Sequence, residues 1–83
     1  MMDTLRQLID KHARLPVAAG TLAPAQDLYA AGLTSFAAVQ LMLALEEAFD
    51  IEFPERMLNR RSFATMSSIT TCINELRPQA LAS

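Results

Sequence analysis

The sequence lacks the residues on which most small catalytic or metal-binding domains depend. It has one cysteine, one histidine and no tryptophan in 83 residues. A single cysteine excludes an intrachain disulfide and gives no indication of an oxidising compartment. A metal site needs several clustered His, Cys or carboxylate ligands, and the sequence offers no such pattern. It also offers no nucleophile with a matching base and orienting group. We therefore expect neither an enzyme nor a metal protein.

Positive charge is missing from the middle of the chain. The stretch from residue 27 to residue 55 has no Lys or Arg, and its acidic residues are Asp27, Glu46, Glu47, Asp50, Glu52 and Glu55. Nucleic-acid binding needs a basic surface, so this distribution argues against nucleic acid as the main partner. An acidic stretch instead fits a protein partner with a basic docking surface.

Long hydrophobic runs are also missing. The apolar run at residues 41–45 is far too short to cross a bilayer, and the N-terminus lacks the apolar segment of a signal peptide. Hydrophobic residues nevertheless make up 52% of the chain, which indicates a packed core rather than disorder. We expect one domain over residues 1–83 with a structured core at about 3–77, and a monomeric cytoplasmic protein without membrane insertion.

The spacing of apolar residues predicts an all-α fold. The expected helices cover residues 3–14, 35–49, 55–60 and 65–76, with a long connection at 15–34. Pro54 is expected to start the short third helix and Pro78 to stop the last one. The inward-facing residues are predicted to be Ala38, Leu41, Met42, Leu45, Ala48 and Phe49 on the second helix and Met66, Ile69, Ile73 and Leu76 on the fourth. The prediction is a small four-helix bundle, three main helices plus one short helix, with a long first loop.

Ser35 stands where the second helix is expected to begin. A serine there is predicted to cap the helix, because its oxygen can accept a hydrogen bond from a backbone N–H of the first turn. The same N–H groups and the helix dipole favour an anion, so a phosphodiester on this hydroxyl would be well placed. Gly32 is expected to supply a backbone angle that other residues resist, and Asp27 to cap a local turn in the loop.

The stretch from Asp27 to Pro54 resembles the phosphopantetheine attachment region of acyl carrier proteins. The positions that carry the resemblance are Asp27, Leu28, Gly32, Leu33, Ser35, Val39, Leu41, Ala44, Leu45, Glu46, Glu47, Phe49, Ile51, Phe53 and Pro54. The resemblance implies an acyl-carrier-protein-like fold in which Ser35 carries 4′-phosphopantetheine, transferred from coenzyme A by a magnesium-dependent phosphopantetheinyl transferase. The thiol of that arm would hold a cargo as a thioester. The implied partners are this transferase, a cargo-loading ligase or acyltransferase (an amino acid:carrier protein ligase among them) and a downstream acceptor enzyme.

Three departures from the family pattern bear on the cargo. The usual Asp-Ser-Leu triplet is replaced by Thr34-Ser35-Phe36, residues 36–43 carry no charge, and the Gly-Gly-His of peptidyl carriers is absent. These features favour a specialised freestanding carrier. The small core offers little room for a long acyl chain, which favours a short acyl or aminoacyl group as the cargo. A carrier for fatty acid or polyketide synthesis remains an alternative.

The second helix has an unusually apolar outer face. Phe36, Val39 and Leu43 lie one turn apart on one side, where they either pack against the long loop or form a docking surface for a partner. The residues predicted to contact partners are Thr34, Phe36, Val39, Gln40, Leu43, Glu47, Arg56 and Arg60. The same face would serve a second hypothesis, a helical adaptor that binds its partner without a prosthetic group.

Overall fold

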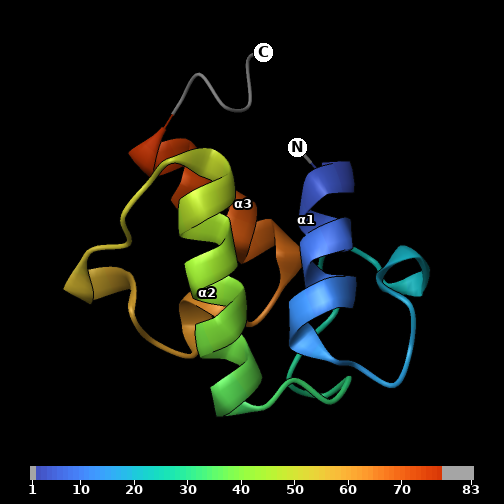
Figure 1. The fold of residues 1–83 in the computed structure, drawn as a ribbon. Coiled ribbons are helices and arrows are strands. Elements are labelled where there is room, and N and C mark those ends of the chain that lie inside the picture. Colours follow the sequence, from blue (N-terminus) through green and yellow to red (C-terminus); the bar gives the residue numbers. More distant parts are fainter. Residues whose placement is uncertain (1, 78–83) are drawn as a thin grey trace.

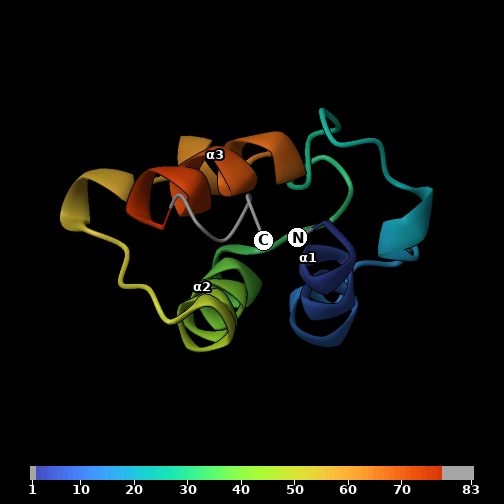
Figure 2. The same ribbon diagram turned by 90° about the horizontal axis from the view of Figure 1, so that it is seen from above.

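Three α-helices form the body of the protein. The computed structural model describes residues 2–77, in which α1 spans Met2–Leu8, α2 spans Ser35–Phe49 and α3 spans Met66–Leu76 (Figure 1). The α1 and α2 helices run side by side in opposite directions, and α3 lies across both of them (Figures 1 and 2). The described residues contain no strand, so the all-α prediction is confirmed. The expected stop at Pro78 lies outside the described residues.

The short third helix is smaller than expected. A 3-10 turn covers Glu55–Met57 and a second one covers Arg61–Phe63, in place of one helix over 55–60. Leu58 leaves the helical region with φ −84° and ψ 68°, which ends the first turn. Tight turns of this kind are common connectors between α-helices. They give the chain between α2 and α3 an irregular course instead of a fourth rod.

The first helix changes its winding before it ends. The α-helical part stops at Leu8, and a π-helical turn follows at Ile9–Ala13. The helix predicted over residues 3–14 is therefore present to Ala13, but its last turn is wider than an α-helix. Ile9 and Ala13 of this turn both lie in the core. Arg14 then adopts left-handed backbone angles, with φ 53° and ψ 43°, which ends the helix.

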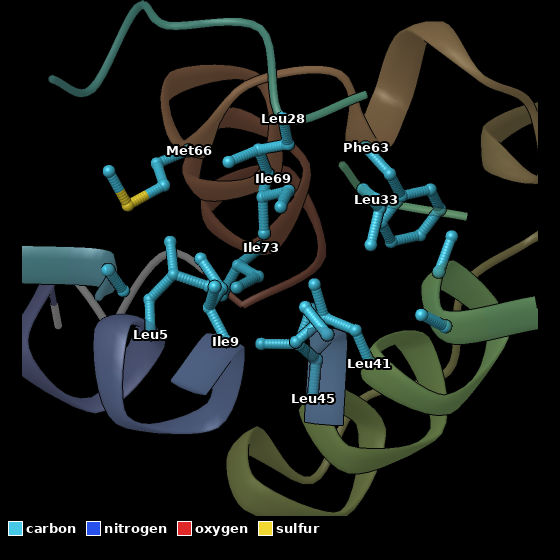
Figure 3. Close-up of a cluster of buried hydrophobic side chains, with 14 of the residues drawn as sticks. Leu5, Ile9, Leu28, Leu33, Leu41, Leu45, Phe63, Met66, Ile69 and Ile73 are labelled. Carbon is cyan, nitrogen blue, oxygen red and sulfur yellow. The ribbon is translucent and has the colours of Figure 1, made fainter. Parts of the chain in front are cut away.

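The core lies where the three helices face one another (Figure 3). Its largest fully buried side chains are Leu5, Ile9, Leu28, Leu41, Leu45, Met66, Ile69 and Ile73.

Three of the predicted inward residues, Met42, Phe49 and Leu76, are only half-buried at the edge of this cluster. Ala48 is exposed and its prediction as a core residue is wrong, because it lines an open groove between the first helix and α2. No helix among the described residues is long and apolar enough to cross a membrane.

The long connection between α1 and α2 is held against α3. The backbone N–H of Leu28 donates to the carbonyl of Ala64 at 2.7 Å, and the N–H of Ser67 donates to the carbonyl of Pro24 at 3.0 Å. Leu22 and Leu33 are buried from the same segment. The loop therefore belongs to the packed structure and sets where α2 begins.

Gly32 occupies a position that only glycine fits. Its φ is +121°, and a Cβ placed there would lie 2.9 Å from Cδ of Pro16. We expect Gly32→Ala to lower the free energy of unfolding by about 1–3 kcal/mol, the usual cost of strained backbone of this kind. Gly20→Ala is the matched control, because a Cβ at Gly20 meets nothing within 4 Å. Urea denaturation of both variants checks this, and equal stabilities would contradict it.

Candidate functional site

The start of α2 is capped by Thr34. The Thr34 hydroxyl accepts a hydrogen bond from the N–H of Ala37 at 3.0 Å, and its carbonyl accepts from the N–H of Ala38 at 2.8 Å. Thr34 has extended backbone angles, φ −95° and ψ 162°, which are those of an N-cap, whereas Ser35 is already the first helical residue. The prediction that Ser35 caps the helix is therefore wrong. Ser35 is exposed, and its hydroxyl makes no hydrogen bond within the part of the chain that the structure describes.

The N-termini of α2 and α3 are used differently. At α3, Thr65 and Ser68 form a reciprocal capping box, with the Ser68 N–H donating to Oγ1 of Thr65 at 2.9 Å. The carbonyl of Pro24 also accepts a hydrogen bond from the N–H of Ser67. The end of α3 is thus occupied by the chain itself, whereas the end of α2 faces solvent beside the Ser35 hydroxyl. Helix N-termini with exposed N–H groups favour an anion.

The turn before Ser35 is fixed by Asp27. Its Oδ1 accepts from the N–H of Tyr29 at 2.9 Å and from the N–H of Ala30 at 3.3 Å. This is the local turn cap predicted for Asp27. The N–H of Leu33 then returns to the carbonyl of Leu28 at 2.9 Å, so Ser35 stands on an ordered segment.

A groove of about 420 Å³ opens beside Ser35, between the first turns of α2 and the segment around residues 58–63. Its lining residues are Tyr29, Ser35, Ala38, Val39, Met42, Leu58, Asn59, Arg60 and Phe63. The walls are largely apolar, with Arg60 as the charged member. A flexible chain attached at Ser35 would have this groove next to its point of attachment.

Tyr29 and Arg60 form a stacked pair in this groove. The guanidinium carbon of Arg60 lies 3.9 Å from the centre of the Tyr29 ring, within the range of a cation–π contact. Burial raises the pKa of the Tyr29 phenol above its ordinary value, the Arg60 charge opposes this and the Asp27 carboxylate adds to it. The phenol therefore stays protonated at neutral pH.

The apolar face of α2 is exposed. The exposed fractions are 74% for Phe36, 49% for Val39 and 51% for Leu43, so these residues do not pack against the long loop. Leu43 lines a second groove of about 520 Å³ between α1 and α2, together with Gln40 and Glu47. Phe36, Val39 and Leu43 thus form an exposed ridge along α2, with one groove on each side of it.

The structure brings together only part of the predicted docking set. Val39 and Arg60 line the groove at Ser35, and Gln40, Leu43 and Glu47 line the other groove. Thr34 and Phe36 line neither of the two. Arg56 lies in neither groove and pairs with Glu75 at 3.3 Å.

Sequence reasoning missed several residues of the site. The groove at Ser35 is also lined by Tyr29, Met42, Leu58 and Phe63. Met42 was predicted to be a core residue, and the other three were not part of the predicted site. The only signal was the apolar character of the loops on either side of α2. Glu46 was counted with the surface acids, yet its Oε2 accepts from the backbone N–H of Phe53 at 2.9 Å and so holds the chain that follows α2.

The features of this site agree with a match to a known family. An exposed serine at the start of a helix, beside an open groove on a small helical domain, is a suitable attachment point for a prosthetic arm. In agreement, residues 3–73 match the family described as "Phosphopantetheine attachment site". The chain belongs to this family of carrier proteins, whose members bear covalently attached 4′-phosphopantetheine.

Relatives with a more specific description are similar to most of the chain. It is 56% identical over 69 residues to the aminoacyl carrier protein of Agrobacterium fabrum strain C58, with 83% of each chain covered. A solved relative belongs to the crystal structure of an engineered Bradyrhizobium japonicum glycine:[carrier protein] ligase complexed with a carrier protein from Agrobacterium tumefaciens and AMP. It is 53% identical, has a TM-score of 0.87 and is matched over 89% of this chain and 99% of its own. A solution structure of a protein from Agrobacterium tumefaciens is 48% identical over the full length of both chains, with a TM-score of 0.75.

Proposed function

We propose that the chain is a freestanding aminoacyl carrier protein that bears its prosthetic arm on Ser35. The observation that carries this proposal is the exposed Ser35 hydroxyl. Because Thr34 supplies the oxygen that caps α2, the Ser35 hydroxyl is not needed as a cap. The relative that is 56% identical is named an aminoacyl carrier protein, and a carrier that is 53% identical occurs in complex with a glycine:[carrier protein] ligase. Both support an amino acid as the cargo.

The residues around Ser35 suit a phosphodiester with a flexible arm. The open end of α2 favours negative charge, Arg60 adds a cation to the same groove, and the apolar walls formed by Val39 and Leu58 suit the arm's carbon chain. When attached, the arm supplies a thiol that holds the cargo as a thioester. The protein's own residues position the attachment point and leave the groove open.

Ser35 acts as a nucleophile only while the arm is being attached. Its Oγ forms a bond to the phosphorus of coenzyme A that bears the pantetheine, and the pyrophosphate bond breaks with release of adenosine 3′,5′-bisphosphate. The hydroxyl proton passes to a base of the transferase. Thr34 stands where related carriers have Asp, so the partner transferase has to accept a neutral residue before the serine.

Partner enzymes carry out every other step in this scheme. The chain itself catalyses nothing; a phosphopantetheinyl transferase attaches the arm, an amino acid:carrier protein ligase loads the cargo and an acceptor enzyme removes it. We place the carrier in the cytoplasm, where coenzyme A and ATP are available. The exposed ridge of Phe36, Val39 and Leu43 is the proposed docking surface for the loading enzyme.

The test is a two-step mass measurement on the whole chain. Incubation with coenzyme A, magnesium and a broad-specificity transferase is expected to add one phosphopantetheine, and fragmentation is expected to place it on Ser35. A glycine:[carrier protein] ligase with ATP and glycine is then expected to add one glycine. An arm on another residue, or no arm on the folded protein with any transferase, would contradict the proposal and favour the adaptor. An arm without loading by any amino acid would favour an acyl cargo.

A further inference from the structure

Arg60 is the charged side chain of the groove at Ser35, and it comes from the connection between α2 and α3. Arg56 and Arg77 are paired with the carboxylates of Glu75 and Asp50, at 3.3 Å and 3.6 Å. Within residues 2–77, no carboxylate pairs with Arg60.

The backbone that bears Arg60 is held on both sides. The amide of Asn59 donates to the carbonyl of Arg56 at 2.9 Å, and the carbonyl oxygen of the same side chain accepts from the N–H of Ser62 at 2.9 Å. Tyr29 is held in its own turn by Asp27. Both members of the stack therefore start from fixed backbone positions, and the guanidinium is placed before any ligand arrives.

Stacking leaves the hydrogen-bonding edge of a guanidinium available. A planar guanidinium on an aromatic face keeps its N–H donors in its own plane, where they can form the paired hydrogen bonds that fit phosphate oxygens. Fixing the side chain in advance also reduces the conformational entropy lost on binding. The stack of Arg60 on Tyr29 is thus a prepared anion-binding group in the groove that Ser35 lines.

We propose that Arg60, held on Tyr29, binds the phosphodiester that joins the prosthetic arm to Ser35. This inference rests on the proposed attachment at Ser35 and adds a residue that positions the arm. Residues 36–43 carry no charge, so α2 itself offers no cation to the phosphate in its first two turns. The contact would fix the first link of the arm at the groove while the thiol end stays free to reach partner enzymes.

The test compares phosphorus NMR of four armed proteins: the wild type, Arg60→Gln, Arg60→Lys and Arg61→Gln. Arg61 is the matched control, because it is exposed and does not line the groove. The phosphodiester resonance of the wild type and of Arg61→Gln is expected at one position, and that of Arg60→Gln at a displaced position. The resonance of Arg60→Lys is expected between these two positions, because lysine keeps the positive charge but lacks the paired, planar N–H donors of arginine. High salt should move the wild-type resonance toward that of Arg60→Gln, because screening weakens an exposed ion pair.

A second readout compares stability with and without the arm. Attaching the arm is expected to lower the unfolding equilibrium constant of the wild type about two- to fivefold more than that of Arg60→Gln, which is the range for an exposed ion pair. The comparison cancels any effect of the substitution on the protein without the arm.

The outcomes separate this inference from the proposed function. A wild type that gains no arm on Ser35 overturns the attachment itself. A wild type that gains the arm but has the same phosphorus resonance as Arg60→Gln overturns the role of Arg60 alone. If only the rate of transfer from coenzyme A falls in Arg60→Gln, Arg60 serves the transferase complex instead and the proposal is wrong. If only loading by the ligase falls, Arg60 is a docking residue and the proposal is wrong too.

Discussion

Ser35→Ala is expected to abolish attachment of the arm while leaving the fold as stable as before. Thr34, and not Ser35, supplies the capping oxygen of α2, so removing the serine hydroxyl breaks no hydrogen bond within the described residues. Alanine also has a higher intrinsic helix propensity than serine. We therefore expect the free energy of unfolding to change by no more than about 0.5 kcal/mol. Intact mass after treatment with coenzyme A and a transferase, together with urea denaturation, measures both effects.

Thr34→Ala should show the reverse pattern. The substitution removes the hydroxyl that accepts the hydrogen bond of the Ala37 N–H. It should lower the free energy of unfolding by about 0.5–2 kcal/mol, as for other N-cap threonines, and the transferase should still attach the arm. The two neighbouring hydroxyls are thus expected to separate stability from modification. A large loss of stability in Ser35→Ala, or loss of the arm in a folded Thr34→Ala, would contradict this division.

Val39→Glu is expected to lower kcat/KM for aminoacylation about 30-fold. Val39 lies at the centre of the exposed ridge and also lines the groove at Ser35, so a charge there would have to be buried in the docked complex. Disrupting a hot-spot position near the centre of an interface costs ~2 kcal/mol or more, and ~2 kcal/mol corresponds to this factor. The arm should be attached before the measurement, so that only the ligase step is compared.

Val17→Glu is the matched control for this experiment. Val17 is 46% exposed, close to the 49% of Val39, but it belongs to the connection after α1 and lines neither groove. We expect the loading kinetics of Val17→Glu to equal those of the wild type. Equal losses in the two variants would show that the added charge, and not the ridge, is responsible.

Much of the fold could be predicted from local patterns. The spacing of Leu41 and Leu45 on α2, and of Ile69 and Ile73 on α3, is that of helices with one buried face, and the structure buries all four. The winding of α1 could not be predicted, because a π-turn at Ile9–Ala13 follows from packing and not from helix propensity.

The details of the site depended on geometry that the sequence does not reveal. Thr34 and Ser35 are both good capping residues, and only the backbone angles decide that Thr34 takes this role. Tyr29 and Arg60 meet across two irregular segments, whose course no periodic pattern predicts. Local pattern therefore predicts that Ser35 stands at the start of a helix, whereas the residues around it need the structure.

The hydrogen bonds that hold the long loop to α3 constrain the order of folding. Leu28 and Pro24 are anchored by Ala64 and Ser67, partners about 40 residues later in the chain. Such distant contacts form late, since a long stretch of chain must first be brought together. A chain still being synthesised has no anchor for this loop until the residues of α3 have emerged. The ordered segment that bears Ser35 thus forms late in folding, once residues 64–67 are available to hold it.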